Sequence, residues 1–459
     1  MQGVIGVYAR EDVGKRSLYT LYGVQHRGQE SAGIAAAGDR SLRVWSAAGL
    51  VSRVFDERYA PFNHPDDYIV VGCASGEDVT GGLTPLILET ERYRIALTLD
   101  GYLPKKPGDS NEKAFFDVLK AKLEGTSIVP ALRETMWSLP TAYYSLVAAV
   151  LDKKDNHSIL FAARDPRGVR PLHVARSKDK LFVASESAPV DVLEGMGEVF
   201  DDRRDVVPGS LIYISSEGIK EEQVLEPCPA HCAFEWVYFG RPDSVMEGKS
   251  VHVARKNLGH ALVKTHGLKK KYGVENGPRK DLAVIPVPDS GRSVTTGVAE
   301  GLGVPADEGI IKNAYLGRTY LIYDPNFRKT ASDLKHNVIR ATVGGKKVAI
   351  CDDSIVRGTV SESVAKNLRK AGATEVDFLV SYAPIFYPCF SDPADKPLAA
   401  KPFKGKSVEE IGNLVAENLP SIDHVLFNTP ESIVESIGLP KQHVCTYCIT
   451  GVDPFKGKD

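Results

Sequence analysis

The run from Lys346 to Ser361 constrains the fold of this chain more than any other stretch. It begins with an apolar segment typical of a buried strand, and that segment ends in Asp352 and Asp353. A short loop containing Gly358 follows, and apolar residues then recur at four-residue spacing from Val360, which predicts an amphipathic helix. A strand, a loop and a helix in this order indicate an open parallel α/β sheet with a ligand site at its carboxyl edge.

The same run has the chemistry of a phosphate site. Backbone N–H groups over 356–359 can bind an anion together with the positive end of the following helix, and Gly358 permits a close approach. The two aspartates can bind ribose hydroxyls or a hard cation such as Mg²⁺. The residues alone leave a second interpretation open, a solvated acidic loop before a helix.

The rest of the chain divides into two parts. A length of 459 residues exceeds what one hydrophobic core usually organises, so two domains are expected. Short β-rich runs and two helix-like segments predict an α+β first part made of stacked sheets, with strands at 68–72, 93–99, 143–151, 180–184 and 210–215 and helices at 15–23 and 111–123. From about Glu226 onward, strands and helices alternate as in a parallel sheet, with strands at 282–287, 347–351 and 375–381 and helices at 294–303 and 361–371.

Composition excludes several classes of protein. The chain is 43% hydrophobic and 25% charged, as in a globular protein, and its net charge of -2 provides no broad field for nucleic acid or an anionic membrane. The longest apolar stretch, 142–151, is too short to span a bilayer, and no signal peptide precedes the charged residues at 10–12. Seven cysteines, an odd number, fit a reducing compartment. We therefore expect a cytoplasmic protein without nucleic-acid or membrane partners.

Residues 352–359 resemble the 5-phosphoribosyl-1-pyrophosphate (PRPP) signature of type I phosphoribosyltransferases, and most closely that of the glutamine PRPP amidotransferase (amidophosphoribosyltransferase) family of purine synthesis. Further similar stretches lie at 25–33, 164–172, 183–187, 234–239, 241–244, 285–291, 311–313 and 317–319. These collinear matches cover nearly the whole chain. The resemblance implies a class II glutamine amidotransferase-like domain over 1–225, with an N-terminal nucleophile (Ntn) hydrolase-like sandwich fold. It implies an α/β type I phosphoribosyltransferase domain with a C-terminal cluster-binding tail over 226–459.

For the second domain, the resemblance implies a complete PRPP site. The residues that it assigns to Mg²⁺ are Ser290, Asp352 and Asp353, and those that it assigns to the PRPP 5-phosphate are Ser354, Ile355, Val356, Arg357, Gly358 and Thr359. Lys312, Tyr315 and Arg318 fall in what resembles a flexible loop that closes over PRPP and excludes water. Two residues depart from the family pattern, Ala314 in place of an arginine and Val360 in place of a threonine.

The first domain lacks the groups that the family's glutaminase chemistry needs. The family's N-terminal cysteine, whose α-amine serves as the base, is replaced by Gln2. Ser75 stands where an arginine grips the glutamine carboxylate, and Asp100 stands where an asparagine donates to the oxyanion. We expect a domain that folds like a glutaminase without hydrolysing glutamine. The alternative is a competent enzyme with an engineered or unprocessed terminus.

The cysteines point to an inorganic group. Cys445 and Cys448 have the spacing of a two-ligand clamp, which alone is compatible with zinc, an iron–sulfur cluster or a redox pair. The resemblance adds Cys232 and Cys389, so that all four match the ligands of the family's [4Fe-4S] members. Such a cluster ties the C-terminal tail to the body, and the remaining cysteines, Cys73, Cys228 and Cys351, have no metal role.

The sequence thus predicts a Mg²⁺-dependent phosphoribosyltransferase. An amine attacks C1 of PRPP, pyrophosphate leaves, and 5-phosphoribosylamine or a related N-phosphoriboside forms. Ammonia, free or supplied by a partner protein, is the natural nucleophile, and another amine remains open. Two alternatives remain, a non-catalytic PRPP-sensing or scaffold subunit that regulates a partner enzyme, and a glutamine-dependent amidotransferase. The resemblance also implies a homodimer or homotetramer.

Overall fold

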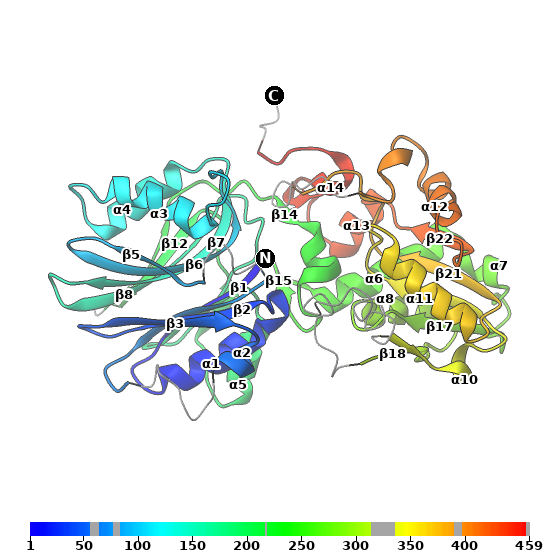
Figure 1. The fold of residues 1–459 in the computed structure, drawn as a ribbon, viewed down its shortest axis with the longest axis horizontal. Helices are drawn as coiled ribbons and strands as arrows, with labels where there is room; N and C mark the ends of the chain where they lie inside the picture. The colour runs from blue at the N-terminus through cyan, green and yellow to red at the C-terminus, as the bar shows by residue number, and fades with distance from the viewer. Residues whose placement is uncertain (56–63, 77–82, 216–217, 314–335, 390–396, 456–459) are drawn as a thin grey trace.

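The first half of the chain forms two antiparallel sheets stacked face to face (Figure 1). The computed structural model describes residues 1–55, 64–76, 83–215, 218–313, 336–389 and 397–455. The first sheet contains β1 (Gln2–Tyr8), β2 (Ser31–Ala37), β3 (Leu42–Ala48), β4 (Ile69–Ser75), β9 (His173–Arg176), β10 (Leu181–Ala184) and β11 (Asp202–Asp205), in the order β11-β9-β10-β1-β4-β2-β3. The second contains β5 (Leu86–Glu89), β6 (Tyr93–Tyr102), β7 (Tyr143–Asp152), β8 (His157–Arg164), β12 (Ser210–Ser215) and β13 (Gly218–Gln223), in the order β13-β12-β8-β7-β6-β5.

Helices cover the outer face of each sheet (Figure 1). They are α1 (Val13–Gly23), α2 (Val51–Val54) and α5 (Ala188–Gly195) on the first sheet, and α3 (Asn111–Lys122) and α4 (Ile128–Trp137) on the second. Alternation along β1 explains this arrangement, because successive side chains of a strand point to opposite faces. Val4 packs with Val147 and Leu160 of the other sheet, whereas Ile5 packs with Leu18 of α1. Both faces of β1 are therefore apolar and buried.

The second half is built on one parallel sheet. Its strands are β17 (Leu282–Pro286), β20 (Lys347–Asp352), β21 (Glu375–Val380) and β22 (His424–Phe427), in the order β17-β20-β21-β22. Residues of α6 (Val251–Thr265), α7 (Leu268–Tyr272) and α8 (Arg292–Leu302) share a core on one face, and those of α11 (Thr359–Lys370) and α12 (Val408–Glu417) share a core on the other. Helices on both faces explain why the strands are almost continuously apolar.

Short elements connect these layers. They are η1 (Gln25–Arg27), β14 (His231–Cys232), the π-helical turn η4 (Glu235–Phe239), β15 (Val245–Met246), β16 (Lys249–Ser250), β18 (Ile310–Lys312), β19 (His336–Val338), α10 (Arg340–Val343), η6 (Lys401–Phe403), α13 (Pro430–Ile437), η7 (Lys441–His443), β23 (Val444–Cys445) and α14 (Tyr447–Thr450). The strands and helices expected from the sequence are all present, with ends that differ by a few residues. Among the helices of the described ranges, none has the length and apolarity that crossing a bilayer requires.

Glycines let α6 and α8 pack at close range. A β-carbon at Gly297 would lie 1.9 Å from the carbonyl oxygen of Lys256, and one at Gly259 would lie 2.3 Å from that of Val294. We expect Gly297→Ala to destabilise the protein by about 2 kcal/mol, because backbone and not a flexible side chain must move. Urea denaturation measures the effect. Gly195→Ala is the control, since its β-carbon meets nothing within 4 Å, and equal stability of the two variants would contradict the expectation.

Candidate active site

The carboxyl ends of β17 and β20 bring together a hydroxyl and two carboxylates. Ser290, which follows β17, donates from Oγ to Oδ1 of Asp352 at 3.3 Å. The N–H of Asp353 donates to the same oxygen at 2.9 Å, and Ser354 Oγ donates to Asp353 Oδ2 at 2.6 Å. Burial, together with the neighbouring Asp353 carboxylate, raises the pKa of Asp352 well above its usual range. Two buried carboxylates side by side are a site that a cation would stabilise.

The loop after these carboxylates leads into the N-terminus of α11. Gly358 precedes the helix with a φ of 82°, a left-handed conformation that favours glycine. It has no side chain with which to cap the first-turn N–H groups, which therefore remain available to an anion. Within this loop, Ile355 is buried, whereas Val356 and Arg357 are exposed. The structure thus places residues 354–359 next to the carboxylate pair, at the N-terminus of α11.

Lys312, at the end of β18, lies beside the segment that follows β17. Its Nζ is 2.8 Å from Oδ2 of Asp289, in the segment that connects β17 to α8. Tyr315 and Arg318, the other residues predicted for the closing loop, lie outside the described residues, as does Ala314. The structure therefore brings one of these three side chains to the edge that carries Ser290.

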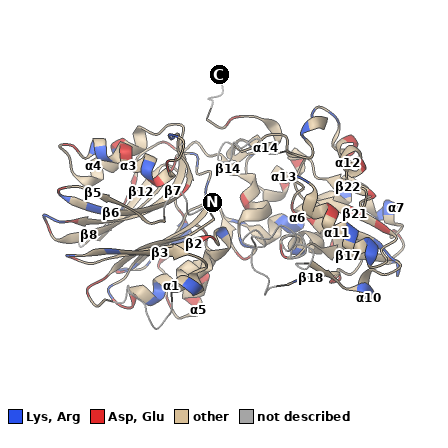
Figure 2. Ribbon diagram, viewed as in Figure 1, with Lys and Arg blue, Asp and Glu red and all other residues tan. Residues whose placement is uncertain are grey.

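A cavity of about 480 Å³ joins this edge to the first half of the chain. The first half contributes Met1, His26, Arg27 and Gly76, and the second half contributes Tyr238, Phe239, Gly240, Arg241, Pro242, Arg255, Pro288, Asp289, Ser290, Lys312 and His336. Figure 2 shows Lys and Arg interspersed with Asp and Glu over both halves, in keeping with the near-zero net charge. Attraction for an anionic ligand therefore comes from the groups that line the cavity.

The residues at the predicted glutaminase positions, Gln2, Ser75 and Asp100, lie within one buried group of polar side chains. The Gln2 side chain donates from Nε2 to Glu112 Oε1 at 3.0 Å and accepts from Thr98 Oγ1 at 3.2 Å. Its backbone N–H donates to Asp100 Oδ1 at 3.0 Å. Ser75 pairs with Gln2 across β1 and β4, and Gln2, Ser75 and Asp100 are all buried. The structure thus brings the three replaced positions to one place.

Arg27 is the hub of a buried ionic network beside them. Its guanidinium donates to Asp100 Oδ2 at 3.0 Å, to Glu186 Oε1 at 2.6 Å and to both oxygens of Glu235 at 3.0 Å. Arg170 adds a bond to Glu235 Oε1 at 2.7 Å. Burial opposes ionisation of Asp100 and Glu186. Interactions with Arg170 and Arg27 for Asp100, and with His26 and Arg27 for Glu186, nevertheless hold both pKa values below their usual range. The carboxylates are therefore anionic at neutral pH.

Sequence reasoning missed this network, although its members lie in stretches that were already singled out. Arg27, Arg170, Glu186 and Glu235 come from the similar stretches 25–33, 164–172, 183–187 and 234–239. A buried arginine requires carboxylate partners, so charged residues inside otherwise apolar motifs are the signal that points to such a network.

The four predicted cluster cysteines come from three distant segments. Cys232 and Cys445 pair in register between the parallel strands β14 and β23, and Cys448 lies in α14. Cys389 contributes electrostatically to the pKa of each of these three thiols, which places it beside them. Burial raises the pKa of Cys445 to about 12 and that of Cys448 to about 11. The structure thus gathers the four cysteines, each partly buried, in one region.

The other three cysteines lie elsewhere. Cys73 is buried in β4, with its Sγ 2.8 Å from Thr84 Oγ1, and Cys351 is buried in β20. Cys228 is exposed.

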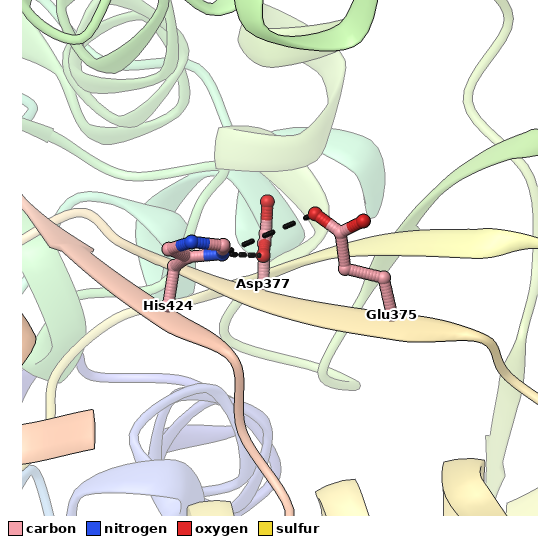
Figure 3. A group of neighbouring side chains, drawn as sticks. All are labelled: Glu375, Asp377 and His424. Carbon is pink, nitrogen blue, oxygen red and sulfur yellow. Dashed lines mark hydrogen bonds and ion pairs between the residues drawn. The ribbon is translucent and has the colours of Figure 1, made fainter. Parts of the chain in front are cut away.

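A further group of potential metal ligands lies at the amino ends of the parallel strands, opposite the Asp352 edge. Figure 3 shows His424 and Glu375 on either side of Asp377, and His424 Nδ1 is 2.7 Å from Asp377 Oδ1. Lys271 Nζ lies 3.3 Å from Asp377 Oδ2, and Lys347 pairs with Glu375. Two ammonium groups already neutralise the two carboxylates, so little charge remains to attract a dication. We interpret the group as a structural contact between strand ends.

Comparisons with known proteins place the chain among enzymes. No family model matches it. It is 32% identical to amidophosphoribosyltransferase of Mycobacterium bovis over 99% of this chain and 86% of that protein. It is 30% identical to amidophosphoribosyltransferase of Methanocaldococcus jannaschii over 99% and 98%. The structure of glutamine PRPP amidotransferase from B. subtilis, complexed with ADP and GMP, superposes with a TM-score of 0.82 at 29% identity over 98% of this chain and 97% of that one. The chain therefore belongs to the amidophosphoribosyltransferase family.

Proposed function

We propose that this phosphoribosyltransferase transfers the phosphoribosyl group of PRPP to ammonia or another amine without hydrolysing glutamine itself. The proposal rests on the difference between the residues that the first and second halves of the chain contribute to one cavity. Ser290, beside the carboxylate pair, lies on the wall from the second half, whereas Arg27, which binds Asp100, lies on the wall from the first. We assign residues 1–225 to a glutaminase-like domain and 226–459 to the phosphoribosyltransferase domain.

In the second domain, Asp352, Asp353 and Ser290 would hold Mg²⁺. The fit rests on the raised pKa of Asp352, because a cation would remove the cost of two ionised carboxylates in one buried place. When bound, Mg²⁺ neutralises charge on the departing pyrophosphate. The N–H groups at the start of α11 would bind the 5-phosphate and thereby fix C1 of the ribose relative to the cavity.

The reaction forms one bond and breaks another. The amine nitrogen bonds to C1, the bond between C1 and the pyrophosphate oxygen breaks with its electron pair on oxygen, and the nitrogen then loses a proton to water. Tyr238 and Phe239 line the cavity beside this centre.

For the first domain, we propose that glutamine hydrolysis is lost because Gln2 and Asp100 do not provide the groups that this reaction needs. The Gln2 side chain is a neutral amide held by Glu112 and Thr98, so it offers no nucleophile. Asp100 is ionised and faces Arg27, and a carboxylate at an oxyanion position would repel the developing charge. Ser75 provides no guanidinium for a substrate carboxylate.

One assay tests this function. Anaerobically purified protein with PRPP and Mg²⁺ is followed for pyrophosphate release with ammonium, with glutamine, or with neither. We expect release with ammonium and none with glutamine at low ammonia. Release with glutamine alone would identify a working glutaminase. PRPP binding without release for any amine would identify a sensing or scaffold subunit.

We further propose that Cys232, Cys389, Cys445 and Cys448 hold a [4Fe-4S] cluster. Four thiolates around one Zn²⁺ lie roughly 4 Å apart. Across the described residues, however, no three of these sulfurs are all within 4.8 Å of one another, which favours a larger inorganic group. When bound, the cluster joins β14 to the C-terminal strand β23.

Metal analysis tests the cluster. We expect about four iron atoms per chain and no stoichiometric zinc in protein purified without oxygen. Cys445→Ser should lose the iron and the visible absorption band of the cluster, because a serine hydroxyl is a poor iron ligand. Cys228→Ser is the control, since Cys228 is exposed and lies outside the group. Zinc in place of iron, or full iron content in Cys445→Ser, would contradict the proposal.

A further inference from the structure

Among the described residues, one buried cation in the cavity wall forms no ion pair with a carboxylate. Arg255, from α6, lines the cavity although it is only 2% exposed. Of the other lysines and arginines in the described cavity wall, Lys312 pairs with Asp289, Arg241 pairs with Asp243, and Arg27 binds three carboxylates. Asp353, Glu186 and Glu235 act on this guanidinium only at a distance, so an anionic ligand in direct contact would lower the cost of its burial.

Two backbone carbonyls hold this guanidinium in place. Nε donates to the carbonyl oxygen of Trp236 at 2.7 Å, and Nη2 donates to that of Gly240 at 2.7 Å. Nη1 makes no hydrogen bond within the described part of the chain, so its two N–H groups remain for a ligand. Burial lowers the pKa of Arg255 to about 10, which still leaves it charged at neutral pH.

The Trp236 carbonyl belongs to the π-helical turn and the Gly240 carbonyl follows it directly, and residues from the first half of the chain bind both ends of this segment. At its start, Glu235 is held by Arg27 through two hydrogen bonds and by Arg170 through a third. Just after its end, the N–H of Arg241 donates to Glu186 Oε2 at 2.8 Å, and Glu186 in turn binds Arg27. The ionic network around Arg27 therefore holds this backbone segment in place, and the carbonyl groups of the segment in turn hold Arg255.

We propose that Arg255 binds the pyrophosphate group of PRPP and that Glu235 and Glu186 are positioning residues that hold it ready. This inference rests on the proposed function of the same cavity. We favour pyrophosphate over a carboxylate-bearing amine because Arg255 lines the same cavity as Ser290, which donates to Asp352 of the carboxylate pair. In this proposal, the glutaminase-like half positions a residue of the transferase half and does not hydrolyse glutamine.

Binding of inorganic pyrophosphate with Mg²⁺ tests the proposal by calorimetry on the full chain, without requiring turnover. Arg255→Gln should weaken binding about 10- to 100-fold, as expected for the loss of charge-assisted hydrogen bonds. Arg255→Lys keeps the charge without the fork and should lose less. Arg203→Gln is the matched control, because Arg203 lies outside the cavity lining and is paired with Asp191 and Glu194, and should bind within about twofold of the wild type.

Separate variants test the positioning role of Glu235 and Glu186. Glu235→Gln and Glu186→Gln should each weaken pyrophosphate binding severalfold while leaving Arg255 in the chain, and two variants at opposite ends of the turn guard against one failing to fold. Wild-type affinity in a folded Arg255→Gln would overturn the binding role. Wild-type affinity in Glu235→Gln and Glu186→Gln, beside a weakened Arg255→Gln, would overturn the positioning role. A wild type that binds pyrophosphate through Arg255 yet releases none with any amine would overturn the proposed reaction and leave this inference standing.

Discussion

Asp352→Asn is expected to reduce PRPP turnover about 100- to 1000-fold while making the protein without ligands more stable. The loss follows because the carboxylate that would hold the cation becomes a neutral amide. The gain follows because the substitution removes a buried charge that lies against Asp353, the cause of the raised pKa of Asp352. The amide oxygen can still accept from Ser290 and from the N–H of Asp353, so the loop keeps its hydrogen bonds.

Pyrophosphate release with ammonium measures the first effect, and thermal unfolding without Mg²⁺ measures the second. Glu375→Gln is the matched control, since it removes one carboxylate from the same sheet at the opposite strand ends. We expect its turnover to stay within about twofold of the wild type. Unchanged turnover in Asp352→Asn, or an equal loss in Glu375→Gln, would contradict the assignment of the carboxylate pair.

The strand–loop–helix unit around Asp352 and the secondary structure of both halves could be predicted from the sequence because their determinants are local. Asp352, Gly358 and the apolar spacing of α11 lie within one short run, and the backbone geometry of a strand–loop–helix unit brings them together without help from distant residues. The β-rich run of β7 and the helical spacing of α3 are equally local.

The ionic network could not be predicted in this way. Arg27 and Glu235 are 208 positions apart, and Arg27 and Glu186 are 159 apart. Their contact depends on how the sandwich meets the second half, which no local pattern encodes. The sequence showed that Asp100 departs from the family's glutaminase, but the structure shows what it contacts, Arg27 and the backbone N–H of Gln2.

Arg27→Met is expected to have the largest effect on stability, a loss of about 3–5 kcal/mol. The substitution leaves Asp100, Glu186 and Glu235 buried without their shared counter-ion, and Arg170 contacts only part of this group. Urea denaturation at neutral pH measures the loss. Arg203→Met is the control, because Arg203 is one-third exposed and pairs with Asp191 and Glu194 at the surface, so its loss should stay below about 1 kcal/mol.

The dependence of this loss on pH separates electrostatics from packing. The folded pKa values of Asp100 and Glu186 are depressed, so the stability that they contribute is present above the unfolded values near about 4 and is lost as the pH falls through the folded values. In Arg27→Met this contribution is already absent at neutral pH. The difference in unfolding free energy between wild type and variant should therefore narrow as the pH is lowered below about 4. A difference that stays constant over this range would mean that Arg27 stabilises the fold by filling space and not by neutralising the three carboxylates.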